Sequence, residues 1–365
     1  MLSLFVTVGI VSAIAAALAG ILVFAEQFIS NYGDCAVDIN AGTRTFTVKG
    51  GKALLGTLVG EKLFVPSACG GRGTCGYCKV KVREGAGPLL PTEEPFLSAA
   101  ERAANVRLAC QVKIRNDIKI EVPPELLAVR EFTCTVAHIT QLTHDIRAYR
   151  LALVDPPEIN FIAGQYAQLL APVYPKSSEE VYRAYSIASD PRDKKAIELI
   201  IRLVPGGICT TYCFEYLKEG DQVKFNGPYG EFRMADTTAP MIMIAGGSGM
   251  APIKCILQHM QNIGSTRDAR YFFGANQVCE LFEQDWMKHC EQTLPHFAFV
   301  PVVLRPETEW HGETGLVTHA VERAYTDLSG HEAYLCGSPG MIDACVVVLT
   351  KLGMPKTKIY YDKFA

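Results

Sequence analysis

Cys69-Gly-Gly-Arg-Gly-Thr-Cys75-Gly-Tyr-Cys78 decides how the first part of this chain folds, together with a fourth cysteine, Cys110, in Leu-Ala-Cys-Gln. Three cysteines on one loop and a fourth far downstream are typical of a plant-type [2Fe–2S] site. The glycines suit such a site, because a loop wrapped closely around a cluster needs positive φ angles and no Cβ in the way. We therefore predict Cys69, Cys75, Cys78 and Cys110 as the ligands of a [2Fe–2S] cluster.

A structural zinc site is the alternative for the same four cysteines. Zinc sites usually pair two short Cys-x-x-Cys units, whereas here a single unit, Cys75–Cys78, is flanked by two isolated cysteines. The first gap holds five residues where the plant-type pattern has four, which indicates a related branch of that pattern. The spacing favours the cluster over zinc.

The composition is that of a folded multidomain protein. The chain has 365 residues, of which 49% are hydrophobic, and a formal net charge of −3. This length is enough for two or three domains, and the charge gives no case for nucleic acid as a partner. Nine further cysteines are expected to be reduced and partly buried thiols: Cys35, Cys134, Cys209, Cys213, Cys255, Cys279, Cys290, Cys336 and Cys345.

Residues 1–25 carry no charged side chain, and Glu26 is the first. As a helix this run is long enough to cross the roughly 30 Å hydrocarbon core of a bilayer, and a helix satisfies its own backbone groups there. The alternative, a signal peptide, needs a basic start and a shorter apolar core, and this segment has neither. We predict a retained transmembrane helix over residues 1–25.

The segment around the cysteine loop, residues 33–128, is predicted to form one domain. Two alternating runs, 36–40 and 44–48, meet at the turn Asn40-Ala-Gly-Thr43 and predict a β-hairpin. A helical stretch over residues 53–61 follows and leads to the cysteines.

A β-rich lobe that binds a flavin is predicted over residues 129–235, after the linker Val122-Pro123-Pro124. In Arg183-Ala-Tyr185-Ser186, the arginine can pair with a diphosphate and the tyrosine can stack on an isoalloxazine ring. The serine hydroxyl can lie beside the reactive flavin nitrogen. For Tyr185 alone, a core aromatic is the alternative.

A second motif in this lobe is Gly206-Gly207-Ile-Cys-Thr210-Thr211-Tyr212. Glycines that lead into a helix form an anion site, and the threonine hydroxyls add donors for a diphosphate. The residues predicted to bind the flavin are Arg183, Tyr185, Ser186, Gly207, Thr210 and Thr211.

Residues 236–365 alternate between apolar strands and helices, as a nucleotide-binding α/β lobe does. The continuous apolar run 241–245 predicts a strand of a parallel sheet, and a glycine-rich turn carries it into a helix. Two more strands are predicted at 271–275 and 333–337, the second ending on Ser338-Pro339. The predicted dinucleotide-binding residues are Gly246, Gly247, Gly249, Met250, Ala251, Pro252, Cys336 and Gly337.

Cys336 ends a predicted strand, where a nicotinamide could lie. We predict Ser186 and Cys336 as catalytic residues. The alternative for Cys336 is a small core residue.

These motifs together resemble the F subunit of the sodium-translocating NADH:quinone oxidoreductase, over essentially the whole chain. The resemblance is carried by Cys69 to Cys78, Leu90-Pro-Thr-Glu93, Arg107-Leu-Ala-Cys110-Gln-Val, Glu121 to Glu125, Gly164-Gln-Tyr166, Arg183 to Ser186, Gly227-Pro-Tyr-Gly-Glu-Phe232 and Gly246 to Pro252. It implies an N-terminal transmembrane helix, a β-grasp plant-type ferredoxin domain, an antiparallel β-barrel flavin domain and a Rossmann-like NAD domain.

The resemblance also implies a function. Electrons would pass from NADH to FAD, to the [2Fe–2S] cluster, and through membrane partner subunits to quinone, with sodium translocation. Phe364 would supply the ring that covers the flavin. A single-pass protein of the bacterial inner membrane, with cytoplasmic catalytic domains, is implied as well.

Three features depart from that family or qualify the resemblance. The stretch between Gly164 and Arg183 is short, Asn276 replaces a basic residue, and the segment 274–280 offers no Arg or Lys for a 2′-phosphate. The last feature favours NADH over NADPH.

Two other functions stay open. The chain could be the reductase component of an oxygenase, although the apolar N-terminus argues against a soluble reductase. It could also be an electron carrier whose C-terminal module serves only for docking.

Overall fold

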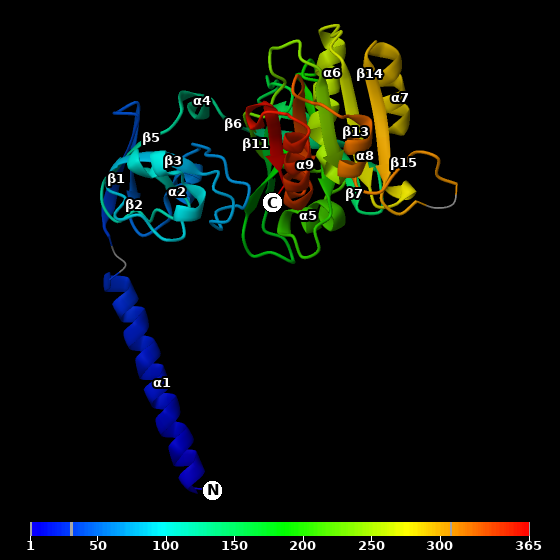
Figure 1. The fold of residues 1–365 in the computed structure, drawn as a ribbon. Coiled ribbons are helices and arrows are strands. Elements are labelled where there is room, and N and C mark those ends of the chain that lie inside the picture. The colour runs from blue at the N-terminus through cyan, green and yellow to red at the C-terminus, as the bar shows by residue number, and fades with distance from the viewer. Residues whose placement is uncertain (1, 30–31, 307–308, 365) are drawn as a thin grey trace. The chain divides into compact units, whose positions relative to one another are not determined.

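The computed structural model describes residues 2–29, 32–306 and 309–364, and within the first helix the side chains of residues 8–21. The described chain forms two units (Figure 1). The first comprises the chain up to Pro66 together with Gly71–Ala128, and the second comprises Ser67–Gly70 together with the chain from Val129 onward.

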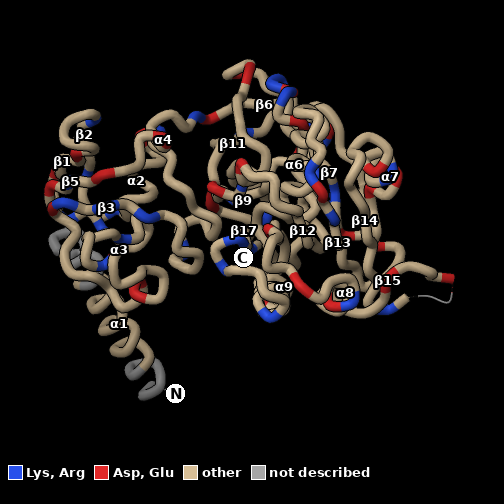
Figure 2. The backbone as a smooth tube through the Cα atoms, turned by 45° about the horizontal axis from the view of Figure 1, so that its top comes forward, with Lys and Arg blue, Asp and Glu red and all other residues tan. Residues whose placement is uncertain are grey.

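The N-terminal segment is one helix, α1 (Leu2–Ile29), where the sequence predicts a helix over residues 1–25. Its described apolar side chains are largely exposed, from 54% at Ile14 to 64% at Ile21, and this part of α1 carries no charged residue (Figure 2). Among the described residues, no helix has both the length and the apolarity required to span a bilayer. The membrane-spanning role of residues 1–25 stays a prediction.

The rest of the first unit is a five-stranded sheet in the order β2-β1-β5-β3-β4. The predicted hairpin is confirmed as β1 (Asp34–Ile39) and β2 (Arg44–Lys49), which pair antiparallel. The predicted helix is confirmed as α2 (Leu54–Gly60), whose leucines are buried in the core of this unit. The other elements are β3 (Lys79–Glu84), a 3-10 turn (Glu94–Phe96), α3 (Ala99–Ala103), β4 (Val106–Leu108), β5 (Ile118–Glu121) and α4 (Pro124–Leu127).

The second unit begins with six antiparallel strands in the order β10-β7-β6-β11-β8-β9. They are β6 (Arg130–Gln141), β7 (Ile146–Asp155), β8 (Tyr166–Ala171), β9 (Val181–Ser186), β10 (Ala196–Arg202) and β11 (Gln222–Tyr229). A bridge between Ile187 and Leu199 joins the two edges, so the sheet closes into a barrel. A short helical segment, α5 (Ile208–Thr211) followed by a π-helical turn (Tyr212–Tyr216), lies between β10 and β11.

The C-terminal part of this unit is a parallel sheet in the order β15-β14-β13-β12-β16-β17. The strands are β12 (Met241–Gly246), β13 (Ala269–Ala275), β14 (Phe297–Val303), β15 (Glu313–Thr314), β16 (Glu332–Gly337) and β17 (Ile359–Lys363). The helices are α6 (Met250–Asn262), α7 (Gln284–Thr293), α8 (Val317–Ala324) and α9 (Pro339–Lys351), with 3-10 turns at Gly247–Gly249, Val278–Glu280 and Lys356–Lys358. The strands predicted at 241–245, 271–275 and 333–337 are confirmed.

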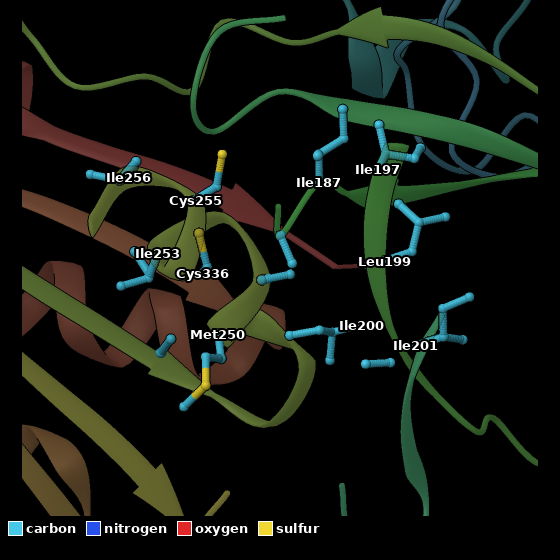
Figure 3. Close-up of a cluster of buried hydrophobic side chains, with 14 of the residues drawn as sticks. Ile187, Ile197, Leu199, Ile200, Ile201, Met250, Ile253, Cys255, Ile256 and Cys336 are labelled. Atoms are coloured by element: carbon cyan, nitrogen blue, oxygen red, sulfur yellow. The ribbon is translucent and has the colours of Figure 1, made fainter. Parts of the chain in front are cut away.

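One hydrophobic core runs from the barrel into the parallel sheet. Leu199 of β10 and Met250 and Ile253 of α6 belong to the same buried cluster, and Figure 3 shows them on facing elements near Cys336. This shared core holds the end of the barrel against the start of α6. The barrel and the parallel sheet of the second unit therefore form one packed body.

Candidate functional site

The parallel sheet has a topological switch point at β12, because the chain continues from β12 to β13 on one side while β16 lies on the other. In open α/β sheets the ligand crevice lies beyond the carboxyl ends of the strands at such a point. The predicted glycine turn, Gly246–Gly249, leaves β12 there and leads directly into α6. Its place in the fold suits the pyrophosphate of a dinucleotide.

Gly249 allows this turn to approach the neighbouring strand. A Cβ at Gly249 would lie 2.4 Å from the carbonyl oxygen of Cys336. Gly247 has φ +55°, a conformation that L side chains rarely adopt. The glycines are thus required by close packing and by backbone geometry, as the sequence predicts for a dinucleotide-binding turn.

Cys336 is fully buried at the end of β16, opposite Asp362 of β17. Burial, and after it the charge of Asp362, raises the pKa of the Cys336 thiol well above its ordinary value. The thiol is therefore neutral at physiological pH. Chemically it is a small, neutral thiol at the end of β16 and not a nucleophile.

Ser186, at the end of β9, donates a hydrogen bond from Oγ to Oδ2 of Asp362 at 3.3 Å. The pKa of the Asp362 carboxyl is raised, because burial outweighs the hydrogen bond from Ser186. The structure thus brings the two predicted catalytic residues, Ser186 and Cys336, to a common neighbour that no sequence motif indicated. Asp362 lies in Tyr361-Asp-Lys-Phe364. Within this stretch the sequence predicts a cofactor contact for Phe364 alone.

Phe364 follows β17 directly and its backbone N–H donates to the carbonyl oxygen of Gly337 at 2.9 Å. This bond fixes the C-terminal residues at the end of β16, beside the crevice. The flavin-covering role of the Phe364 ring remains a prediction, and its backbone position is compatible with that role.

Arg183 and Tyr185 lie on β9, the edge strand next to β8. The guanidinium of Arg183 donates from Nη1 to the carbonyl oxygen of Tyr182 at 2.8 Å. Tyr185 packs against the core of the second unit, where burial, the nearby Cys209 and Cys213 thiols and a hydrogen bond with Cys209 raise the pKa of its hydroxyl. One part of the Tyr185 ring is thus anchored in the core, so the core-aromatic alternative accounts for part of its role.

The glycine motif of the barrel forms a turn that ends in α5. The hydroxyl of Thr210 accepts from the N–H of Val204 at 3.2 Å and lies within hydrogen-bond distance of the carbonyl oxygens of Val204 and Gly207. Thr210 therefore braces the turn itself. Thr211, half-buried at the end of α5, is the better placed of the two predicted hydroxyl donors.

Three of the predicted cluster ligands lie together in the first unit. A hydrogen bond with Cys110, then burial and the charges of Cys110 and Cys75, raise the pKa of the Cys78 thiol. The N–H of Ala109 donates to the carbonyl oxygen of Cys78 at 2.7 Å, which ties the downstream cysteine to the loop. Cys69 lies in Ser67–Gly70, the segment grouped with the second unit.

The loop has the backbone that a cluster requires. Gly70, Gly71, Gly73 and Gly76 all have φ between +64° and +89°. Within the described ranges, no three His, Cys, Asp or Glu side chains are grouped to hold a single metal ion. A [2Fe–2S] cluster divides four thiolates between two irons, and this donor set of soft sulfur atoms fits it.

A buried ion pair joins the segment 87–93 to β4, the strand that precedes Cys110. Arg107 and Glu93 are 2% and 0% exposed, and their closest contact, Nη2 to Oε2, is 2.6 Å. Glu93 also accepts from the N–H groups of Leu90 and Leu108, and Arg107 donates to two carbonyl oxygens of residues 87–88. Burial alone would raise the pKa of Glu93, but the Arg107 and backbone hydrogen bonds lower it below its ordinary value.

Beyond β13, the turn at Asn276 is held by a carboxylate. Oε2 of Glu280 accepts from the backbone N–H of Asn276 at 2.9 Å and from its side-chain Nδ2 at 3.2 Å. Asn276 is exposed and Glu280 half-buried, so the carboxylate lies at the surface next to the ends of β12 and β13. The sequence shows that Asn276 stands where the family has a basic residue, but no sequence motif singles out Glu280.

Three family models match successive parts of the chain. Residues 37–115 match the 2Fe-2S iron-sulfur cluster binding domain, 133–234 the oxidoreductase FAD-binding domain, and 243–346 the oxidoreductase NAD-binding domain. The F subunit of the Na(+)-translocating NADH-quinone reductase of Neisseria meningitidis is 33% identical over 95% of this chain and 96% of its own length. This chain belongs to the family of these F subunits. The relative from Idiomarina loihiensis, of the same name, is 32% identical over 100% of both chains.

Solved structures share the architecture of this F-subunit family member. The Amycolatopsis cytochrome P450 reductase GcoB has a TM-score of 0.72 and 30% identity, covering 90% of this chain and 98% of its own. The ferredoxin reductase of carbazole 1,9a-dioxygenase has a TM-score of 0.69 and 26% identity, covering 91% and 99%. The ferredoxin, flavin and NAD domains predicted from the sequence are confirmed, as are the three cofactors, [2Fe–2S], FAD and NADH.

Proposed function

We propose that this chain is the NADH-oxidising subunit of a membrane-bound NADH:quinone oxidoreductase. It passes electrons from NADH to FAD and the [2Fe–2S] cluster, and on to membrane partner subunits. The observation that carries the proposal is near-full-length identity of 33% to the F subunit of a sodium-translocating complex. Three cofactor domains in one chain supply a complete route from a two-electron donor to a one-electron carrier.

The residues of this chain divide the work. When bound, the flavin accepts a hydride and releases single electrons to the cluster. The Gly246–Gly249 turn binds the dinucleotide, and Arg183 with the turn before α5 binds the flavin diphosphate. Ser186 donates its hydroxyl proton in a hydrogen bond to Oδ2 of Asp362; this pair would lie beside the flavin, and the buried Cys336 would help to exclude water. The cluster is held by the four predicted cysteines.

NADH is the proposed donor in preference to NADPH, and Glu280 is proposed to enforce that choice. A carboxylate beyond the second strand of a dinucleotide fold can accept a hydrogen bond from the ribose 2′-hydroxyl and repels a 2′-phosphate. The exposed amide of Asn276, which Glu280 holds, gives a phosphate no positive charge.

We expect Asn276→Arg with Glu280→Gln to lower the NADH-to-NADPH preference, measured as the ratio of kcat/KM values, by about tenfold or more. The removed negative charge and the added guanidinium both act on the 2′-phosphate. Asp285→Asn, at a side chain that is 98% exposed on α7, is the matched control and should leave the ratio unchanged. An unaltered preference in the double variant would contradict the role of Glu280.

Membrane attachment is proposed to use α1. Its described apolar side chains are exposed and residues 1–25 carry no charge, so single-pass insertion into the bacterial inner membrane would bury them. The Idiomarina relative aligns with this chain over its full length, the N-terminal segment included. The catalytic domains would then lie in the cytoplasm, where NADH is available.

Purification in mild detergent tests the partners and the coupling together. The full chain is expected to co-purify with membrane subunits and to support quinone reduction that sodium stimulates. A chain that starts at Tyr32 is expected to enter the soluble fraction, with NADH oxidation by ferricyanide retained. Full membrane attachment of the truncated chain, or quinone reduction indifferent to sodium, would contradict the corresponding part of the proposal.

The oxygenase-reductase function is the second candidate, supported by the two solved structures named for such systems. The alignment with the Idiomarina relative spans 409 positions against 365 residues here, so the relatives contain residues that this chain lacks. We expect one such gap in the short stretch between Gly164 and Arg183. The residues missing there would alter how the chain docks to its partners. A hydroxylase in place of membrane subunits among the co-purified proteins would favour this alternative.

A further inference from the structure

A side-chain amide contacts one of the predicted cluster cysteines. Nε2 of Gln111 donates to Sγ of Cys110, with a distance of 3.7 Å between the two atoms. Hydrogen bonds to the ligand sulfurs are among the factors that set the reduction potential of an iron–sulfur cluster. The contact therefore lies where a protein can adjust the cluster without being one of its ligands.

The amide is held from its other end. Oγ1 of Thr92 donates to Oε1 of Gln111 at 3.0 Å, which leaves the Nε2 hydrogens for the sulfur. The cluster-ligating thiolate of Cys110 can only accept, so it requires the donor end of the amide, and the hydroxyl of Thr92 holds the other end. Thr92 thus positions Gln111 rather than contacting the cysteine itself.

The cysteine loop makes room for this arrangement. A Cβ at Gly73 would lie 2.5 Å from Nε2 of Gln111, and Gly73 has φ +76°. The amide occupies space that a glycine at this position leaves open. The same side chain therefore lies against the loop that carries Cys75 and against the downstream Cys110.

The buried Arg107–Glu93 ion pair lies beside this arrangement in the chain. Glu93 follows Thr92 and accepts from the N–H of Leu108 at 2.9 Å, while Arg107 anchors the same carboxylate. Thr92 is next to Glu93 in the chain, and Cys110 is three residues after Arg107. The Arg107–Glu93 ion pair therefore links the segment that carries Thr92 to the segment that carries Cys110 and Gln111. A preorganised dipole of this kind costs no rearrangement when an electron arrives.

We propose that Gln111 raises the reduction potential of the [2Fe–2S] cluster through its hydrogen bond to Cys110, and that Thr92 is its positioning residue. This inference rests on the proposed ligand role of the four cysteines. Reduction adds one electron, and part of the added negative charge resides on the ligand sulfurs. A donor at Sγ stabilises that charge, so the reduced cluster gains more from Gln111 than the oxidised cluster does.

The test is an EPR-monitored redox titration of the holoprotein. We expect Gln111→Leu to keep its cluster but to lower the equilibrium constant for cluster reduction about tenfold, a shift of about 59 mV to more negative potential for one electron. Thr92→Val should shift the potential in the same direction by less, and Thr92→Ser, which keeps the hydroxyl, should restore the wild-type potential. Thr47→Val is the control and should leave the potential unchanged. Thr47 lies on β2, whereas Cys110 and Gln111 follow β4, and these two strands are at opposite edges of the sheet.

A wild-type potential in a cluster-loaded Gln111→Leu protein would overturn the inference while leaving the proposed function intact. If Gln111→Leu fails to assemble its cluster, the two Thr92 variants decide: equal potentials in both would overturn the positioning role. A cluster that persists without Cys75 would instead refute the ligand set on which the inference rests.

Discussion

Replacing Cys75 with alanine is expected to abolish the [2Fe–2S] cluster while NADH still reduces the flavin. Cys75 lies on the glycine-rich loop, and the charges of Cys75 and Cys110 act on the buried thiol of Cys78. Removing one of four thiolates leaves one iron without its full ligand set. The proposed flavin and dinucleotide sites belong to β9, α5 and the ends of β12 and β16, none of which contains Cys75.

Three measurements separate the two halves of the electron route. In Cys75→Ala, the cluster absorbance and EPR signal should disappear, and stopped-flow reduction of the flavin by NADH should keep its wild-type rate. Reduction of quinone by the assembled complex should fall more than about 100-fold, since losses at outer-shell residues alone reach 10- to 100-fold. Cys279→Ala, at an exposed cysteine outside the cluster motif, should change none of these. Loss of flavin reduction in Cys75→Ala would refute this division of labour.

Replacing Arg107 with methionine is expected to be the most destabilising single change in the first unit. The substitution leaves the carboxylate of Glu93, which is 0% exposed, without its cation. Removing one partner of a buried ion pair typically costs about 3–5 kcal/mol. Urea unfolding at neutral pH should show this loss for the first unit. The double variant Arg107→Met with Glu93→Leu should recover much of it, because no buried charge then remains.

The pH dependence of this pair has a definite sign. The pKa of Glu93 is lower in the folded protein than in the unfolded chain, for which the ordinary value is about 4.3. The stabilisation is therefore complete above that value and is lost as the pH falls through the folded pKa. In Arg107→Met the hydrogen bonds from Leu90 and Leu108 remain but those from Arg107 are lost, so the pKa of Glu93 should rise relative to the wild type. The defect should therefore be largest at neutral pH and shrink on acidification. A defect that grows as the pH falls would contradict this account of the pair.

Local patterns predicted most of the secondary structure around the site. The hairpin of β1 and β2, the helix α2, the strands β12, β13 and β16 and the glycine turn before α6 all follow from alternation, apolar runs and glycine spacing. Such features depend on neighbours within a few residues. The helix α1 shows the limit of this reasoning. Its uncharged, apolar sequence predicts a helix, but the pattern does not identify what covers its exposed side chains.

The site residues that no motif indicated are those whose partners are distant in the chain. Asp362 meets Ser186 across 176 positions, and Gln111 meets Thr92 across 19. An aspartate near a C-terminus and a glutamine after a cysteine carry no pattern of their own. Sheet pairing of β16 with β17 and the buried Arg107–Glu93 pair bring them to the site.

By itself, then, the sequence determined the chemistry: four cysteines in a cluster spacing, a flavin motif and a glycine turn name the three cofactors, because each cofactor demands particular atoms at short range. The tertiary structure decided the surroundings of those atoms. It buried Cys336, set the carboxyl of Asp362 against Ser186, engaged Thr210 with its own turn and placed the amide of Gln111 against Cys110, a predicted cluster ligand. Burial and long-range hydrogen bonds exist once strands from distant segments pair, so no local pattern encodes them.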